Sequence, residues 1–272
     1  MTELKLIESN DYIYILKYVT SYSTSCRSMK LNEEQIKSAV RQRYGRLAVL
    51  NESCCGDESG SCCTSSLTES DLPKEAVDVV ASCGSPLTHV KVREGETVLD
   101  LGSGGGVDVF RASKLVGTTG KVIGLDATPE MIFRARETAK KYAYQNVEFR
   151  LGEIEHMPIE GNSVDLVISN CVLNLVPDKQ LAFREIYRVL KPGGRISVSD
   201  MVASREGRKE VKAEEWADCI AGAVTFSEYR STLEKSGFTD IEGSDESHPI
   251  NDEVAAKGFQ VKSVAWKATK PS

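Results

Sequence analysis

The sequence predicts an α/β fold in which helices cover both faces of a mostly parallel sheet. Two observations carry this prediction. Between residues 95 and 200, short apolar runs alternate with segments whose apolar residues recur at helical spacing. A glycine-rich turn, Gly102 to Gly106, joins the first apolar run to the first helical segment. A strand, a glycine turn and a helix in this order are typical of α/β proteins that bind a nucleotide.

The elements of this fold are expected to alternate along the chain. The sequence predicts strands at residues 97–101, 121–125, 147–151, 164–169 and 195–200, and helices at residues 106–116, 129–144 and 178–190. A further helix, residues 226–236, precedes two strand-like segments near residues 239–244 and 259–268. Because no helix separates these last two segments, we expect them to form an antiparallel hairpin at the edge of the sheet.

The N-terminal part differs in character, and we expect residues 1–70 to form an extension ahead of a domain at residues 71–272. Asn32 is predicted to cap a short amphipathic helix that ends at Gly45. Another helix is predicted from Asp71 to Ala81. Met29 directly precedes the first of these helices, so we hypothesise that residues 1–28 are absent from the native protein. Its intact mass tests this.

The composition excludes several kinds of protein. A net charge of −6 argues against a general nucleic-acid binder, which needs a basic surface. No apolar run approaches the roughly 18 residues of a membrane span. The apolar segment at residues 12–19 is short and lacks a cleavage site, so it is a poor signal peptide. We therefore expect a cytoplasmic protein that binds neither nucleic acid nor membrane. A monomer is the default expectation, since the sequence carries no signal for its oligomeric state.

Ligands of open α/β sheets bind beyond the carboxyl ends of the strands. Nine candidate residues stand at or just after the ends of four predicted strands: Asp100, Gly102, Ser103, Gly104, Asp126, Ala127, Ile154, Glu155 and Asn170. Asp126 follows Gly102 by 24 residues, a position at which an acidic side chain accepts hydrogen bonds from ribose hydroxyls. The turn has the form G-x-G-x-G rather than G-x-G-x-x-G, which disfavours a dinucleotide.

The turn Asp100-Leu-Gly-Ser-Gly-Gly-Gly106 resembles motif I of the class I S-adenosylmethionine-dependent methyltransferases. The resemblance covers about residues 75–270 and implies their Rossmann-like, seven-stranded sheet. It also implies that S-adenosylmethionine is the cofactor and that the nine candidate residues bind it. The implied contacts are to methionine from Asp100, Gly102, Gly104 and Asn170, to ribose from Asp126, and to adenine from Ile154 and Glu155.

The chain has eight cysteines, and several of them stand near this predicted site. Cys171 follows Asn170 and is expected in the same crevice, which Cys83 can border from its place ahead of the first strand. Cys219 lies in a long connection, about residues 201–225, that we expect to form a lid. Each cysteine alone is well explained as a small buried hydrophobe. Three of them converging on one crevice favour ligation of a soft atom.

Four more cysteines occupy a polar loop rich in glycine and serine: Cys54, Cys55, Cys62 and Cys63. Two Cys-Cys pairs do not have the spacing of a zinc site. The loop is interpreted either as a mobile segment with incidental thiols or as a thiol relay that captures a metalloid.

Three segments resemble the arsenite S-adenosylmethionine methyltransferases: Ala81-Ser-Cys-Gly-Ser-Pro86, Ser169-Asn-Cys-Val-Leu-Asn-Leu175 and Trp216-Ala-Asp-Cys-Ile-Ala-Gly-Ala223. The resemblance implies that Cys83, Cys171 and Cys219 bind trivalent arsenic, supplied as inorganic or thiol-conjugated arsenite. It further implies that one cysteine of the polar loop exchanges disulfides.

The chemistry of arsenic agrees with this resemblance. Three thiolates around a soft, trivalent atom leave its lone pair free to attack a sulfonium methyl group, and no general base is needed. Methylation formally oxidises arsenic, so thiols must return electrons by forming a disulfide. An external thiol reductant, thioredoxin or glutathione-like, would restore them. The implied role is arsenic detoxification.

Two other interpretations stay open on the sequence. One is a class I methyltransferase for a small organic acceptor, because much of the pattern is shared across that wider group. The other is a thiol-rich protein that binds a metalloid without turnover. Methylation of arsenite separates the arsenite methyltransferase from both.

Overall fold

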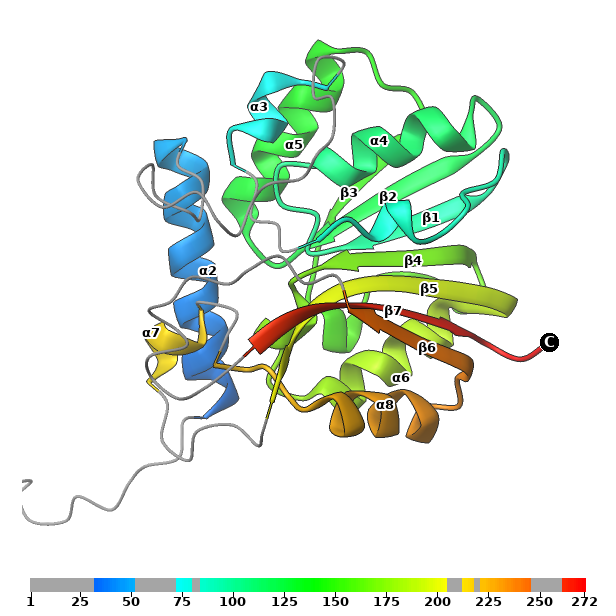
Figure 1. The fold of residues 1–272 in the computed structure, drawn as a ribbon. Helices are drawn as coiled ribbons and strands as arrows, with labels where there is room; N and C mark the ends of the chain where they lie inside the picture. Colours follow the sequence, from blue (N-terminus) through cyan, green and yellow to red (C-terminus); the bar gives the residue numbers. More distant parts are fainter. Residues whose placement is uncertain (1–31, 52–71, 80–83, 205–211, 218–220, 246–260) are drawn as a thin grey trace, which may run out of the picture. The chain divides into compact units, whose positions relative to one another are not determined.

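The structure is a computed structural model that describes residues 32–51, 72–79, 84–204, 212–217, 221–245 and 261–272 (Figure 1). Seven strands form its sheet: β1 (Thr97–Leu101), β2 (Lys121–Asp126), β3 (Val147–Leu151), β4 (Val164–Asn170), β5 (Leu190–Ala203), β6 (Thr239–Asp245) and β7 (Val261–Thr269). Their order is β3-β2-β1-β4-β5-β7-β6. β7 runs antiparallel to both β5 and β6, whereas β1 to β5 are parallel. The predicted seven-stranded α/β fold with an antiparallel edge hairpin is confirmed.

Helices cover both faces of this sheet (Figure 1). One face carries α4 (Val107–Val116) and α5 (Pro129–Lys141), and the other carries α6 (Lys179–Val189) and α8 (Phe226–Lys235). Val98 and Leu99 are neighbours in β1, both are fully buried, and they belong to different hydrophobic cores. Because successive strand side chains point to opposite faces, the uninterrupted apolar runs follow directly from coverage on both sides.

Six shorter or peripheral elements complete the described chain: α2 (Glu33–Leu50), α3 (Lys74–Val77), α7 (Ala213–Trp216) and the 3₁₀ turns η2 (Pro86–Thr88), η3 (Ile154–His156) and η4 (Leu173–Leu175). α2 packs against α5 and α7. The structure does not test the predicted division at residue 70, and that division stays a prediction. No helix among the described residues is both long and apolar enough to cross a bilayer.

Helix α2 begins as predicted but ends later. Asn32 caps it, because its Oδ1 accepts from the Gln35 amide at 2.8 Å and the Gln35 side chain accepts from the Asn32 amide in return. The helix continues through Gly45 to Leu50, and Asn51, which has a φ of 57°, is its C-cap. A Cβ at Gly45 would lie 3.0 Å from the Glu130 carboxylate, so this glycine allows close packing and does not mark a helix end.

The boundaries of two other helices differ from the prediction. α5 ends at Lys141 rather than at residue 144, since Ala143 has a left-handed φ of 55°. The helix expected from Asp71 is the short α3, which starts after Pro73; Asp71 and residues 80–81 lie outside the described residues.

β5 is longer than predicted at both ends. Residue 190 was expected to end the preceding helix and residues 191–194 to connect it to the strand, but all five belong to β5. The Gly193 amide donates to Lys270 at 2.9 Å, and the Lys270 amide donates to Gly194 at 2.8 Å. The β4–β5 register shifts there, as at a bulge. At its other end β5 extends to Ala203, so the connection predicted to start at about residue 201 begins at residue 204.

Candidate active site

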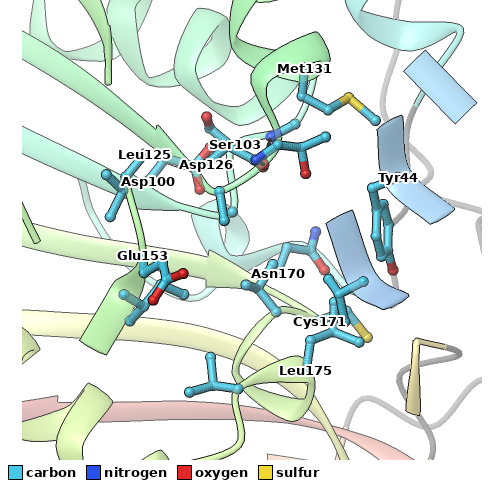
Figure 2. A pocket seen from close by; sticks show the side chains of 18 of the residues that line it. Tyr44, Asp100, Ser103, Leu125, Asp126, Met131, Glu153, Asn170, Cys171 and Leu175 are labelled. Atoms are coloured by element: carbon cyan, nitrogen blue, oxygen red, sulfur yellow. Dashed lines mark hydrogen bonds between the residues drawn. The ribbon is translucent and has the colours of Figure 1, made fainter. Parts of the chain in front are cut away.

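A pocket lies at the carboxyl ends of β1, β2 and β4 (Figure 2). All nine residues predicted to bind a cofactor line it, and Cys171 lines it with them: Asp100, Gly102, Ser103, Gly104, Asp126, Ala127, Ile154, Glu155, Asn170 and Cys171. Tyr44 of α2 borders the pocket from outside the sheet. The structure therefore gathers the predicted residues in one place, although their binding roles stay predictions.

The glycine turn shapes the floor of this pocket. Gly102 has a φ of 65°, and a Cβ on it would lie 2.2 Å from a methyl carbon of Val172, so only glycine fits. Gly106 ends the turn as the N-cap of α4 and provides no side-chain cap. The first amides of α4 consequently remain available to a ligand. The Ser103 hydroxyl is buried and has no partner in the described part of the chain.

Two buried carboxylates behave differently in the pocket. Asp126 accepts from the Gly104 amide at 2.9 Å and the Thr128 amide at 2.8 Å. Burial raises its pKa, although these hydrogen bonds oppose the rise. Asp100 is only 3% exposed, and no described residue donates to its carboxylate. Burial, together with the charges of Asp108 and Asp126, raises the pKa of Asp100 well above its ordinary value. An unpartnered acceptor of this kind suits a ligand that brings a positive charge and N–H donors.

α2 forms a roof over the far side of the pocket. Lys37 Nζ lies 2.8 Å from Glu153 Oε2 and 3.0 Å from Glu155 Oε1, and Arg41 lies 3.1 Å from Glu153. The Glu155 side chain is 5% exposed. Burial lowers the pKa of Lys37, but the hydrogen bonds to both glutamates outweigh it and the net change is a rise. The bond from Lys37 is the main cause of the lowered pKa of Glu153.

The sequence prediction did not include these roof contacts. Lys37, Arg41 and Tyr44 follow a spacing of i, i+4 and i+7, so they share one helix face. This spacing was the sequence signal that could have predicted that α2 borders the pocket. The apolar residues Val40 and Tyr44 of the same helix also line the pocket.

Asn170, the last residue of β4, and Cys171, which follows it, line the pocket at the end of this strand. The Asn170 side-chain amide donates to the Gly84 carbonyl at 2.8 Å, which joins the chain next to position 83 to the end of β4. Cys171 has a φ of 61° and is 3% exposed, and its amide donates to Ser199 at 2.7 Å. Cys171 forms a disulfide. Since it is the single cysteine among the described residues, its partner lies outside them.

The long connection after β5 contacts the turn that follows Cys171. The Trp216 indole N–H donates to the Leu175 carbonyl at 3.1 Å. A Cβ on Gly222 would lie 1.9 Å from the Asn174 carbonyl oxygen, so the two backbones touch there and glycine is required. The described residues on both sides of positions 218–220 thus reach the same turn.

Several predicted site residues lie outside the described chain: Cys54, Cys55, Cys62, Cys63, Cys83 and Cys219. Of the three predicted arsenic ligands, the structure therefore describes Cys171. In the part that it describes, no three His, Cys, Asp or Glu side chains cluster as a metal site would require.

Comparisons with known proteins identify relatives along most of the chain. The model of the methyltransferase domain family matches residues 93–245. The arsenite methyltransferase of Halobacterium salinarum is 39% identical over 256 residues, covering 83% of this chain and 66% of that protein. That of Aquipseudomonas alcaligenes is 34% identical over 215 residues, covering 74% and 62%. The crystal structure of an arsenic(III) S-adenosylmethionine methyltransferase from Chlamydomonas reinhardtii has a TM-score of 0.67 and 35% identity, over 74% of this chain and 72% of that one.

The sheet order, the glycine turn and the pocket at the strand ends define a class I methyltransferase. Within that class, the chain belongs to the arsenite methyltransferase family. It spans 66% and 62% of the length of the two curated relatives. The activity and substrate of this particular chain are therefore a matter for proposal and test.

Proposed function

We propose that this chain transfers methyl groups from S-adenosylmethionine to trivalent arsenic bound by Cys83, Cys171 and Cys219, and so serves arsenic detoxification. One observation carries the proposal beyond family membership. Two separate segments, each next to one of the other two cysteines, are held against the end of β4 that bears Cys171. Asn170 holds Gly84, and the turn after Cys171 contacts Trp216 and Gly222.

The pocket supports S-adenosylmethionine as the cofactor, which would supply an electrophilic methyl group on a sulfonium. Asp100 would accept hydrogen bonds from the amino group of its methionine part, because that carboxylate is buried and no described residue donates to it. Asp126 would face ribose, and its bonds to the turn hold it in place. Glu155 and Ile154 would face adenine under the roof of α2.

In the proposed reaction, arsenic held by three thiolates attacks the methyl carbon with its lone pair. The carbon–sulfur bond of the sulfonium breaks, and its electron pair stays on sulfur as S-adenosylhomocysteine. Arsenic rises formally from the trivalent to the pentavalent state, and two thiolates then return two electrons by forming a disulfide. The disulfide at Cys171 supports such a step, because it means that the Cys171 sulfur can form a disulfide with another cysteine of the chain.

An external thiol reductant, thioredoxin or glutathione-like, would reduce that disulfide for the next turnover. We further propose that one of Cys54, Cys55, Cys62 and Cys63 relays the exchange, that the protein acts in the cytoplasm as a monomer, and that its substrate is inorganic or thiol-conjugated arsenite. A reducing compartment fits an enzyme that needs free thiols.

The test is to incubate reduced protein with arsenite, S-adenosylmethionine and excess thiol, and to measure methylated arsenic by chromatography with elemental detection. Cys171→Ser and Cys219→Ser should each lose methylation while retaining affinity for S-adenosylhomocysteine. Cys26→Ser is the matched control and should retain activity. If wild-type protein binds the cofactor but forms no methylated arsenic, the acceptor is organic or the protein only binds metalloid. Full activity in either of the first two variants would refute the ligand assignment.

A further inference from the structure

The turn after Cys171 presents three consecutive carbonyls to two side chains from other elements. Lys179 Nζ donates to the Asn174 carbonyl at 3.4 Å and to the Val176 carbonyl at 3.2 Å. Between them, the Leu175 carbonyl accepts from Trp216 at 3.1 Å. Lys179 is the first residue of α6, and Trp216 is the last residue of α7. The turn is therefore held from two sides at once.

The Lys179 side chain is half-buried, and its ammonium interacts electrostatically with Asp200 and Glu155. Burial lowers the pKa of Lys179 to about 8, opposed by the charges of Asp200 and Glu155. Asp200 is fully buried and accepts from the Tyr229 hydroxyl at 3.1 Å. Lys179 Nζ also lies 5.7 Å from the centre of the Trp216 ring, within range of a cation–π contact. Removing a charged amine from water is unfavourable, so we expect its hydrogen bonds to give Lys179 a structural role.

We propose that Lys179 is a positioning residue: it fixes the turn that follows Cys171 against Trp216, so that the Cys171 sulfur is held where arsenic must bind. This inference rests on the proposed function. Leu175 and Val176 of the turn line the pocket at the strand ends, but Lys179 itself does not. Its influence passes through the backbone of residues 174–176.

The geometry explains why this turn needs external support. Cys171 holds a left-handed backbone conformation, which non-glycine residues adopt only when their surroundings enforce it. The 3₁₀ turn η4 leaves its last carbonyls without partners inside the turn. Gly222 touches the Asn174 carbonyl directly, so a shift of that carbonyl would displace the long connection as well. Lys179 Nζ donates to the same carbonyl.

The central test separates arsenic binding from cofactor binding. Lys179→Met keeps the bulk of the side chain and removes its donors. We expect reduced Lys179→Met to bind arsenite about tenfold more weakly by calorimetry, since it lacks two hydrogen bonds from a charged donor. Affinity for S-adenosylhomocysteine should be unchanged, and Lys179→Arg should recover part of the arsenite affinity. Lys235→Met is the matched control, because Lys235 is an exposed lysine that lines the same surface pocket as Lys179.

A second measurement does not depend on arsenic. The amides of Leu175 and Val176 bond to Val172 and Leu173 within the turn, so Lys179→Met should accelerate their hydrogen exchange. Trp216→Phe, which keeps a ring but loses the indole donor, should do the same and should couple non-additively with Lys179→Met.

The outcomes distinguish the two claims. If wild-type protein binds no arsenite, the proposed function fails, and this inference falls with it. If arsenite binds but exchange at the turn is unchanged in Lys179→Met, the positioning role alone is wrong. Equal losses of arsenite and S-adenosylhomocysteine affinity would also overturn it, because they would indicate general damage to the fold.

Discussion

Gly102 is a single residue on which the whole pocket depends. Its positive φ and the close approach of Val172 both exclude a side chain. We expect Gly102→Ala to lower the free energy of unfolding by about 2–4 kcal/mol and to abolish binding of S-adenosylhomocysteine, through overpacking and backbone strain. Chemical denaturation and calorimetry measure the two effects. Adding Val172→Ala should recover part of the stability by removing the clash, and no recovery would mean that the backbone strain dominates.

Asp200 makes stability depend on pH. Burial raises its pKa to about 7, an effect that Lys179 and Tyr229 oppose. Between about pH 4 and 7, the folded protein therefore keeps a proton that the unfolded chain releases, and stability falls as pH rises. Asp200→Asn should flatten this decline, because it removes the group that titrates between these pH values. Urea denaturation under reducing conditions at pH 5 and 7 measures this. A parallel decline in both proteins would contradict the assignment.

Among the elements, α2 shows how a helix outside the sheet can complete a ligand site. We expect Lys37→Met to weaken binding of S-adenosylhomocysteine about three- to tenfold, because it leaves Glu155 buried without its cation. Calorimetry at low and moderate salt measures the change. Arg41→Met is the control and should have a smaller effect, because Arg41 bonds to the more exposed Glu153. An unchanged affinity in Lys37→Met would mean that the roof is not part of the cofactor site.

The start of α8 is held by a reciprocal cap. Thr225 Oγ1 accepts from the Glu228 amide, and the Glu228 carboxylate accepts from the Thr225 amide at 2.8 Å. Thr225→Ala should cost about 1 kcal/mol of stability, whereas Thr225→Ser should cost little because it keeps the hydroxyl. Denaturant titration of both variants compares them. Equal stability of the alanine variant and the wild type would show that packing alone holds this helix.

At the scale of the whole molecule, the sequence by itself determined the fold class and most of the pocket. Apolar runs of strand length alternate with helical patterns, and that periodicity reflects burial on two faces of a sheet. The glycine turn and Asp126 are adjacent to strand ends, so parallel topology alone brings them together. The predicted ends of elements were wrong where a glycine was interpreted as a stop but has another role. Gly45 packs against Glu130 inside α2, and Gly193 lies in a bulge within β5.

Only the tertiary structure decided which distant residues complete the site. The ion pairs of Lys37 with Glu153 and Glu155 join residues more than one hundred positions apart, and no local pattern specifies such a pairing. The contacts of Lys179 and Trp216 with the turn after Cys171 arise from how α6 and α7 pack. Periodicity records which face of an element is buried, whereas its partner depends on the packing of the entire chain.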